Sequence, residues 1–312
     1  MKATLRPSSD RLALMQEGIT HLQQWLRDLI KIGILQFDFE TSVFEISSRM
    51  VDAKLGAIAN RLRQMSLLDR TDPEWVQRIT TDLAKLFLIT LQFSRLDKLS
   101  EAEKSGLFAQ SGFSIRRENL IQQKGLRDLW LVVGQNKSQA ENLQIRKTWL
   151  SGVQSARTAL ILDYAFGRST FKEKYLVGSL LKGTLVYYPG TFAMRALLKD
   201  KTEQKLTDQK PASFKSIEAF LKQYATALSK NLWIENFPCS LSNIRVFPDG
   251  AGFALVDQYH KKITISDQER GWNLVSLSGG GPIQLFGEWN GRKLYPLSFY
   301  DLQKIYALES DC

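Results

Sequence analysis

Hydrophobic positions in the first third of the chain recur at the spacing of an α-helix. Apolar residues return every three or four positions over residues 12–37 and 42–67, and again from residue 73 to residue 93. This spacing places them on one side of a helix, where they can pack into a core. We therefore predict a helical bundle domain over residues 1–123.

Capping residues mark where several of these helices begin. Asp72 is a favourable N-cap, and Pro73 suits the first position of a helix. Ser100 followed by Glu103 has the capping-box pattern, which predicts a short helix at this point. Ser114 predicts one further helix start before the bundle ends.

The pattern then changes from helical spacing to short apolar runs and alternation. Such runs over residues 129–133, 143–150 and 158–166 predict three strands, with a turn-rich connection over 134–142. We interpret the three strands as the central β-meander of the protein.

Strands and helices alternate in the segment that follows the meander. A strand over 180–188 is followed by a short helix over 192–198. Residues 199–213 are polar and predict a mobile loop. Helical spacing returns over residues 214–233.

The last part of the chain has the pattern of strands joined by turns. Asn290-Gly291 is a strong hairpin signal, because both residues accept the positive φ of a type I′ turn. Strands are predicted over 244–247, 253–256, 263–265, 272–277, 283–289 and 293–297, and a terminal helix over 300–308.

These elements together predict an α+β fold with two domains. The N-terminal helical bundle is expected to pack on antiparallel β structure, either a meander, a sandwich or a partial barrel. The β domain spans residues 124–312 and contains an inserted helix at about residues 214–233.

Positive charge is concentrated in the middle of the chain. The net charge is +10, and residues 124–232 contain 18 Lys and Arg against 8 Asp and Glu. Such an excess favours a polyanionic partner: nucleic acid, an anionic lipid surface or an acidic protein. The other interpretation is a set of solvated lysines. Nucleic-acid contacts are predicted for Arg146, Lys147, Trp149 and Arg157, because a Trp beside basic residues can stack on a base.

The sequence lacks the common signatures of metal, cofactor and nucleophile sites. Neither His21 nor His260 has a metal-binding neighbour at ligand spacing, and the two cysteines, Cys239 and Cys312, are far from both. A phosphate-binding loop, a dinucleotide fingerprint and a nucleophile elbow are not found. We expect no cofactor, no bound metal and no catalytic residue.

Arginine and aspartate residues border several predicted elements. Such pairs usually link parts of a fold, so we expect Arg49, Asp52, Arg127, Asp128 and Asp163 to be structural polar anchors. The alternative is that those near the central strands act in an enzyme of unknown class.

Several segments together resemble one bacterial family. The segments WLRDLIKIG, SSRMVDAKLGAIANRLRQM, RDLWLVVGQ, IRKTWLSG, RTALILDYAFG, LVYYPG and LFGEWNG occur in this order between residues 25 and 291. They are similar to the region that follows the zinc finger in bacterial SWIM zinc finger family proteins. The C-x-C…C-x-H array that defines the finger is not found in this sequence, because its two cysteines cannot supply it.

The resemblance implies a role in recognition. It implies an accessory or adaptor protein, with a SWIM finger protein, a MoxR-type ATPase or a von Willebrand factor A protein as its partner. We therefore predict a non-enzymatic interaction protein. Nucleic-acid binding through residues 124–232 is the alternative. The chain has no apolar run long enough for a membrane span and no apolar signal core, so we expect it in the cytoplasm.

Overall fold

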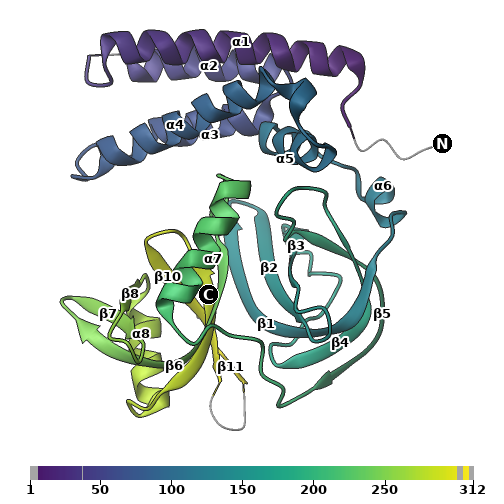
Figure 1. The fold of residues 1–312 in the computed structure, drawn as a ribbon, viewed down its shortest axis with the longest axis vertical. Helices are drawn as coiled ribbons and strands as arrows, with labels where there is room; N and C mark the ends of the chain where they lie inside the picture. The colour runs from purple at the N-terminus through teal and green to yellow at the C-terminus, as the bar shows by residue number, and fades with distance from the viewer. Residues whose placement is uncertain (1–5, 37, 301–304, 309–312) are drawn as a thin grey trace. The chain divides into compact units, whose positions relative to one another are not determined.

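The computed structural model describes residues 6–36, 38–300 and 305–308. The chain forms two compact units (Figure 1). One contains residues 1–122 with 189–191, and the other contains residues 123–188 with 192–312. The predicted fold class is confirmed, because a helical region is followed by two largely antiparallel sheets.

The first unit is a bundle of amphipathic helices. Their buried faces carry large apolar side chains, among them Leu22, Leu26 and Met50, that are at most 2% exposed. The helices are α1 (Ser9–Ile32), α2 (Phe39–Asp52), α3 (Gly56–Ser66), α4 (Trp75–Phe93), α5 (Glu101–Ser111) and α6 (Arg117–Ile121), with a short 3-10 helix at Leu96–Lys98.

Side-chain capping explains the starts of α1, α2 and α5, whereas α3, α4 and α6 begin without it. The start predicted at Ser114 was wrong, because α6 begins at Arg117. The box predicted at Ser100 and Glu103 is present at the start of α5. The carboxylate of Asp72 accepts the N–H of Glu74 at 2.9 Å, but α4 itself begins at Trp75, later than predicted.

The single helix predicted over residues 42–67 was wrong. The structure ends α2 at Asp52 and begins α3 at Gly56. Lys54 between them has φ 62°, a left-handed conformation that a helix cannot continue through. The break turns Leu55 into the core, where it is 0% exposed.

The second unit contains two sheets built by consecutive stretches of chain. Strands of the first sheet are β1 (Leu126–Ala140), β2 (Leu143–Gly152), β3 (Thr158–Phe166), β4 (Ser179–Tyr187) and β5 (Ala196–Leu206). Helix α7 (Ile217–Lys230) follows. The second sheet contains β6 (Phe237–Asp249), β7 (Gly252–Val256), β8 (Lys262–Ile265), β9 (Ile283–Trp289), β10 (Lys293–Tyr300) and β11 (Ile305–Ala307), with α8 (Gln268–Ser278) between β8 and β9.

The two sheets share one strand order. In the first, the order is β3-β2-β1-β4-β5, and in the second the same order recurs as β8-β7-β6-β9-β10. The end strands also meet in parallel in both sheets, at Leu160 and Arg195 in the first and at Thr264 and Lys293 in the second. Because β10 pairs with both β8 and β9, strands β6–β10 close into a barrel. In the first sheet, the described residues link β3 to the segment before β5 only through the bridge between Leu160 and Arg195, so β1–β5 do not close fully, and we call them the half-barrel.

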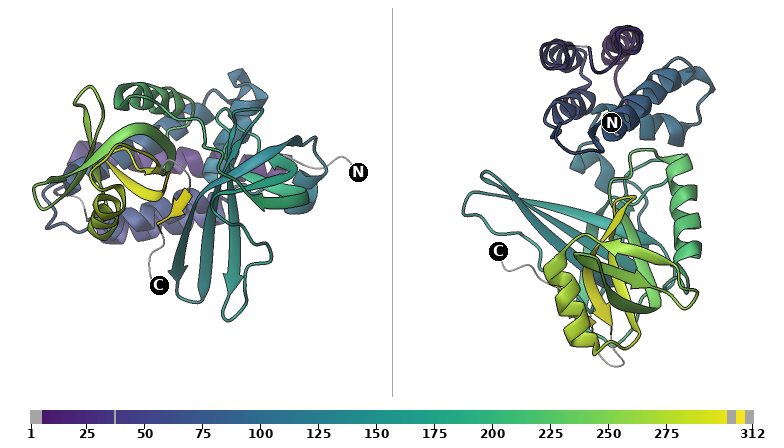
Figure 2. Two further views of the ribbon diagram at one scale, coloured as in Figure 1. Left: turned by 90° about the horizontal axis from the view of Figure 1, so that it is seen from below. Right: turned by 90° about the vertical axis from the view of Figure 1, so that its left-hand side faces the viewer.

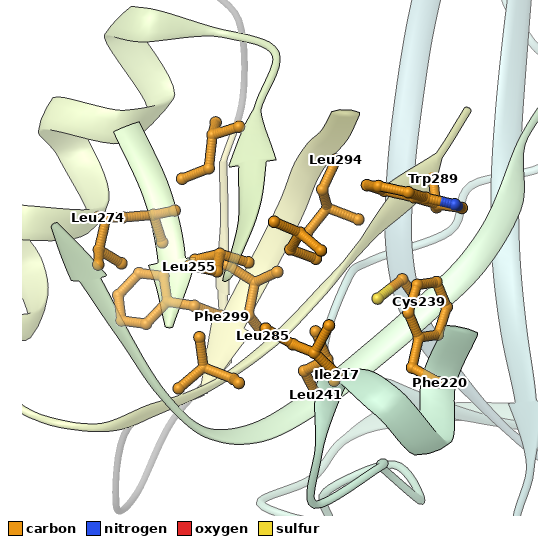
Figure 3. Packing of buried hydrophobic residues seen from close by; sticks show 14 of the residues in the cluster. Ile217, Phe220, Cys239, Leu241, Leu255, Leu274, Leu285, Trp289, Leu294 and Phe299 are labelled. Atoms are coloured by element: carbon orange, nitrogen blue, oxygen red, sulfur yellow. The ribbon is translucent and has the colours of Figure 1, made fainter. Parts of the chain in front are cut away.

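Each barrel has its own apolar interior. Trp130, Val132 and Leu150 lie inside the half-barrel, where Trp130 donates its indole N–H to the carbonyl of Gly183 at 3.1 Å. The closed barrel is filled by residues of β6, β7, β8, β9 and β10, with Phe220 of α7 and Leu274 of α8 packed against them (Figure 3).

A third apolar cluster joins the outside of the half-barrel to the closed barrel. It contains Leu131, Val133 and Trp149 from the first sheet with Phe286, Leu297 and Tyr300 from the second. The side chain of Ser298 also donates to the carbonyl of Val133. The two barrels therefore form one compact unit.

Five predicted elements in this unit were wrong. The turn-rich connection over 134–142 is mostly the second half of β1. No helix forms over 192–198, and β5 takes residues 196–206 from that predicted helix and from the predicted loop over 199–213. Residues 272–277 belong to α8 rather than to a strand. Of the predicted terminal helix, Tyr300 ends β10 and residues 305–307 form β11, while residues 301–304 lie outside the described residues.

Candidate interaction surfaces

Strands β2 and β3 present a row of apolar side chains on their outer face. The pairing register places Ile145 opposite Tyr164 and Leu143 opposite Phe166. Leu162 lies two residues before Tyr164, on the same face of β3. We call these five residues the β2–β3 stripe. Because neighbouring residues of a strand point to opposite faces, the stripe excludes Arg146 and Asp163.

The stripe is open to solvent at its aromatic end. Tyr164 is 50% exposed and Phe166 is 68% exposed, whereas Leu143, Ile145 and Leu162 are half-buried. Figure 2 shows that the strands carrying the stripe extend beyond the rest of the β structure. An exposed apolar patch of this kind is typical of a binding surface.

The backbone beside the stripe is also available. Strand β3 is at the edge of its sheet, and its free side meets the segment before β5 only at Leu160, whose N–H donates to Met194 at 2.8 Å. From residue 161 to residue 166, no strand pairs with this side of β3 among the described residues, although the N–H and the carbonyl of Phe166 are hydrogen-bonded to the hydroxyl of Ser169 at 2.8 Å and 2.6 Å. An open edge of this length is a template for one more strand.

Of the residues predicted to contact nucleic acid, Lys147 and Arg157 keep some exposure to solvent but have different neighbours. Lys147 is half-buried on the same face as the stripe, opposite Leu162. Arg157 is exposed, but its guanidinium lies 3.9 Å from the centre of the Tyr187 ring. Burial and, less strongly, the charge of Asp128 raise the pKa of Tyr187 to about 12, although the charge of Arg157 lowers it.

Arg146 is a structural residue rather than an accessible cation. It is 5% exposed and binds Asp163 at 2.8 Å and the carbonyl of Glu173 at 2.7 Å. The rings of Phe171 and Tyr175 lie 4.4 Å and 5.1 Å from its guanidinium carbon. The nucleic-acid contact predicted for Arg146 is therefore wrong, since the side chain points to the inner face of β2.

Trp149 lies on the outer face of β2, but the closed barrel covers it. Its exposure is 0%, and its indole N–H donates to the carboxylate of Glu288 at 2.7 Å. Asn136 contacts the other carboxylate oxygen of Glu288 at 3.4 Å. The ring cannot stack on a base in this position, so the prediction for Trp149 is also wrong.

Asp128 organises the turn between β2 and β3. It is 5% exposed and accepts the backbone N–H groups of Leu129, Gln154 and Ser155 at 2.7–3.1 Å. Burial raises the pKa of this carboxyl, but the hydrogen bonds from Ser155, Gln154 and Leu129 together hold it below its usual value. The carboxylate fixes the turn in its folded shape.

Three other predicted anchors are exposed. Arg49 and Asp52 lie on the outer side of α2, and Arg127 lies on β1. Within the described parts of the chain, no ion pair involves any of the three. The expected anchoring by these side chains is therefore not found.

Several basic residues of 124–232 already have partners within the chain. Besides the buried Arg146, Lys201 binds Glu173 at 2.7 Å and Lys199 donates to the carbonyl of Gln123 at 3.3 Å. Nucleic-acid binding by this segment as a whole stays a prediction.

The helical unit contains a separate hollow of about 440 Å³. Its lining includes Leu12, Phe93 and Phe108, with Arg6 and Lys104 at the rim. Both rim cations contact the carboxylate of Glu101, Lys104 at 3.5 Å. The lining also contains Gln16, Ser94 and Asp97, so the hollow is of mixed character, and its two cations are already paired with Glu101.

Reactive side chains are dispersed. No three His, Cys, Asp or Glu side chains come close enough to bind a metal ion in the part of the chain that the structure describes. Cys239 is buried in the closed barrel, and burial raises the pKa of its thiol well above the usual value. Cys312 lies outside the described residues. None of the described helices has the length and apolar character needed to cross a bilayer.

The exposed aromatic residues of the stripe were missed as site residues. Their signal was present, because Leu160, Leu162, Tyr164 and Phe166 alternate with other residues in the predicted strand. Alternation shows that they share a face, but it does not show which part of that face another sheet covers. Leu160 is half-buried in the third cluster, whereas Phe166 is exposed.

Comparison with known proteins identifies part of the helical unit. Residues 10–110 match the family model of the SWIM-associated four-helix bundle domain. No curated protein and no solved structure matches the chain. The family match lies within the helical unit, and similarity to SWIM-associated proteins is found there.

Proposed function

We propose that this chain is a non-enzymatic interaction protein that binds a protein partner on the β2–β3 stripe. The observation that carries the proposal is the exposure of Tyr164 and Phe166 on an edge strand of the half-barrel. Exposed aromatic residues are enriched at protein interfaces, and they contribute much of the binding free energy when a partner covers them.

The partner that fits this surface is an extended segment with apolar side chains at alternating positions. Its backbone would pair with the open side of β3 over residues 161–165, and its side chains would pack on the stripe. Main-chain hydrogen bonds then supply affinity, and the side-chain contacts supply specificity.

The match of residues 10–110 to the SWIM-associated bundle domain is compatible with an adaptor role. In such a role, the β unit holds one protein while the helical unit supports a second interaction. The partners implied by the resemblance of the sequence, a SWIM finger protein, a MoxR-type ATPase or a von Willebrand factor A protein, are the first to test.

The double variant Tyr164→Ser/Phe166→Ser tests the proposal. Both side chains are largely exposed, so the variant should fold like the wild type, as circular dichroism and thermal unfolding can verify. Affinity capture from the native host, with quantitative mass spectrometry, should recover a partner with the wild type. The amount of that partner recovered with the variant should be lower by about tenfold or more.

A matched control is Leu206→Ser on β5, which removes another exposed apolar residue from the same sheet (73% exposed). This control should retain the partner. Equal recovery by all three proteins, or no partner enriched by the wild type, would remove the proposal.

A further inference from the structure

The outer face of the closed barrel has a composition different from that of the β2–β3 stripe. Ile244, Val246 and Leu255 point into the barrel, so the residues between them point outward. The outer residues form a set that we call the Phe247 face. Its members are Arg245, Phe247, Val256, Lys262, Thr264 and Lys293, and all are exposed or half-buried.

The pairing registers make this face continuous across four strands. Phe247 of β6 lies beside Ala254, Ala254 beside Thr264, and Thr264 beside Lys293 of β10. Arg245 lies beside Val256, which lies beside Lys262. Phe247 is 47% exposed. Arg245 precedes it by two residues on the same strand, Lys262 lies two strands away and Lys293 three strands away along the path through β7 and β8.

The cations of the face can reach an anionic ligand. Arg245 uses one N–H for the carbonyl of Gly280 at 3.0 Å and has others left to donate. Lys262 binds Asp249 at 2.9 Å, but both side chains are exposed, and an exposed ion pair is weak. No ion pair to Lys293 is found between the described residues.

Nearby acids do not neutralise these cations. Asp257 is 4% exposed and accepts the N–H groups of Ile217, Tyr259 and Lys261 at 2.8–3.0 Å. Asp267 accepts the N–H of Arg270 at the start of α8. Among the described residues, Asp249 is thus the acid that forms an ion pair with a cation of the face, although residues 233–312 as a whole carry more acidic than basic residues.

From this arrangement we infer that the Phe247 face binds single-stranded nucleic acid. The ring of Phe247 stacks on a base, and Arg245, Lys262 and Lys293 contact phosphates on either side. Stacking needs the flat side of a base, which a duplex hides between neighbouring base pairs. Aromatic stacking within a cationic groove is how proteins bind single strands without reading their sequence.

The barrel architecture supports the same site by analogy. Five strands closed in a Greek-key barrel, with the helix α8 between the third and fourth strands, form the architecture of the OB-fold. In that fold, the face of the second and third strands binds oligonucleotides, and here these strands are β7 and β8. Fold analogy alone does not give function, so the inference depends on the residues of the face.

This inference goes beyond a protein partner, and its test measures nucleic-acid binding rather than capture of a partner. Fluorescence anisotropy with a labelled oligothymidylate of about 12 nucleotides measures binding at low salt, with a duplex of equal length for comparison. The wild type should prefer the single strand. Phe247→Ala should weaken binding about 5- to 150-fold, which corresponds to the loss of one stacked base.

A second variant reports on the phosphate contacts. Lys262→Gln/Lys293→Gln should make the slope of log K against log salt shallower by about 1.4, since each lost contact to a single strand contributes about 0.7. Phe44→Ala on α2, which removes a side chain that is 72% exposed, and Lys222→Gln on α7 are the matched controls. Both should bind like the wild type.

The outcomes decide the inference. It is overturned by absence of wild-type binding at low salt, by wild-type affinity in Phe247→Ala, or by an unchanged salt slope in the double lysine variant. Loss of binding in Tyr164→Ser/Phe166→Ser with retention in Phe247→Ala would move the site to the stripe and also overturn it. Loss of the protein partner alone leaves the nucleic-acid result unaffected.

Discussion

At the scale of residues, Asp128 shows how a buried carboxylate can hold a turn without a cation beside it. Its two oxygens accept three backbone N–H groups, two of which come from the turn after β2. Gly152 lies next to this side chain, and a Cβ on Gly152 would come within 2.6 Å of the carboxylate of Asp128. The side chain and the glycine therefore define one turn together.

Asp128→Asn should lower the free energy of unfolding by about 1–3 kcal/mol at neutral pH, because the amide nitrogen of Asn cannot accept hydrogen bonds from the backbone N–H groups that it would face. Chemical denaturation measures the change. Asp52→Asn, an exposed acid on α2, should leave the stability within about 0.5 kcal/mol of the wild type.

The effect of Asp128→Asn should depend on pH. The folded protein lowers the pKa of this carboxyl, so its stabilisation is complete above the ordinary Asp value of about 3.9 and is lost as the pH falls through the lower folded value. The stability difference between wild type and variant should narrow below about pH 4. A difference that stays constant down to pH 2 would contradict the assigned role.

At the scale of elements, local patterns predicted structure wherever the local sequence and the tertiary environment agree. Strand β3 occupies the predicted residues 158–166, and β2 extends its prediction by two residues. The sequence of β5, KDKTEQKL after its first three residues, has the composition of a loop, but edge pairing with β4 makes it a strand. Tertiary pairing of this kind is not visible in the order of residues.

The same limit applies to the candidate sites. Alternation in β2 separates Arg146 from Lys147, but the sequence does not indicate that Arg146 is the inner one. Trp149 faces outward like Lys147, and only the closed barrel, more than a hundred residues later in the chain, buries it. The position of that barrel could not be predicted from local spacing.

Gly134 lets the two barrels approach closely. A Cβ on this residue of β1 would lie 2.7 Å from the ring of Phe286 and 3.0 Å from Leu297. Gly134→Ala should therefore destabilise the protein by about 1–3 kcal/mol through overpacking, as measured by denaturant unfolding.

Gly56→Ala provides the matched comparison. Gly56 begins α3, and a Cβ there would meet no atom within 4 Å. The substitution should be neutral or stabilise by up to about 1 kcal/mol, because alanine favours the helix. Equal destabilisation by both variants would show that the close approach at Gly134 has no special role.

At the scale of the whole molecule, the same strand order occurs in both sheets of the β unit, and the third apolar cluster joins the half-barrel to the closed barrel. The contact of Trp149 with Glu288 is the polar part of this junction. Glu288 is 3% exposed, so its carboxylate depends on Trp149 and Asn136 for hydrogen bonds. The barrels should consequently unfold together.

Trp149→Phe should raise amide hydrogen exchange in both barrels by a similar factor, about 5- to 150-fold, since a buried charged group loses a partner worth about 1–3 kcal/mol. Trp272→Phe, at a ring that is 58% exposed, is the control and should leave exchange unchanged. Faster exchange confined to the half-barrel would show that the two copies open independently.

The repeated strand order also has a consequence for synthesis on the ribosome. All five strands of the half-barrel are complete by residue 206, yet the residues that cover Leu131, Val133 and Trp149 come from β9 and β10, which end at residue 300. At ordinary elongation rates the emerging chain leaves this apolar surface uncovered for roughly 5–20 s. During that interval a nascent-chain chaperone has a defined surface to bind, and it must release that surface before the second copy can dock.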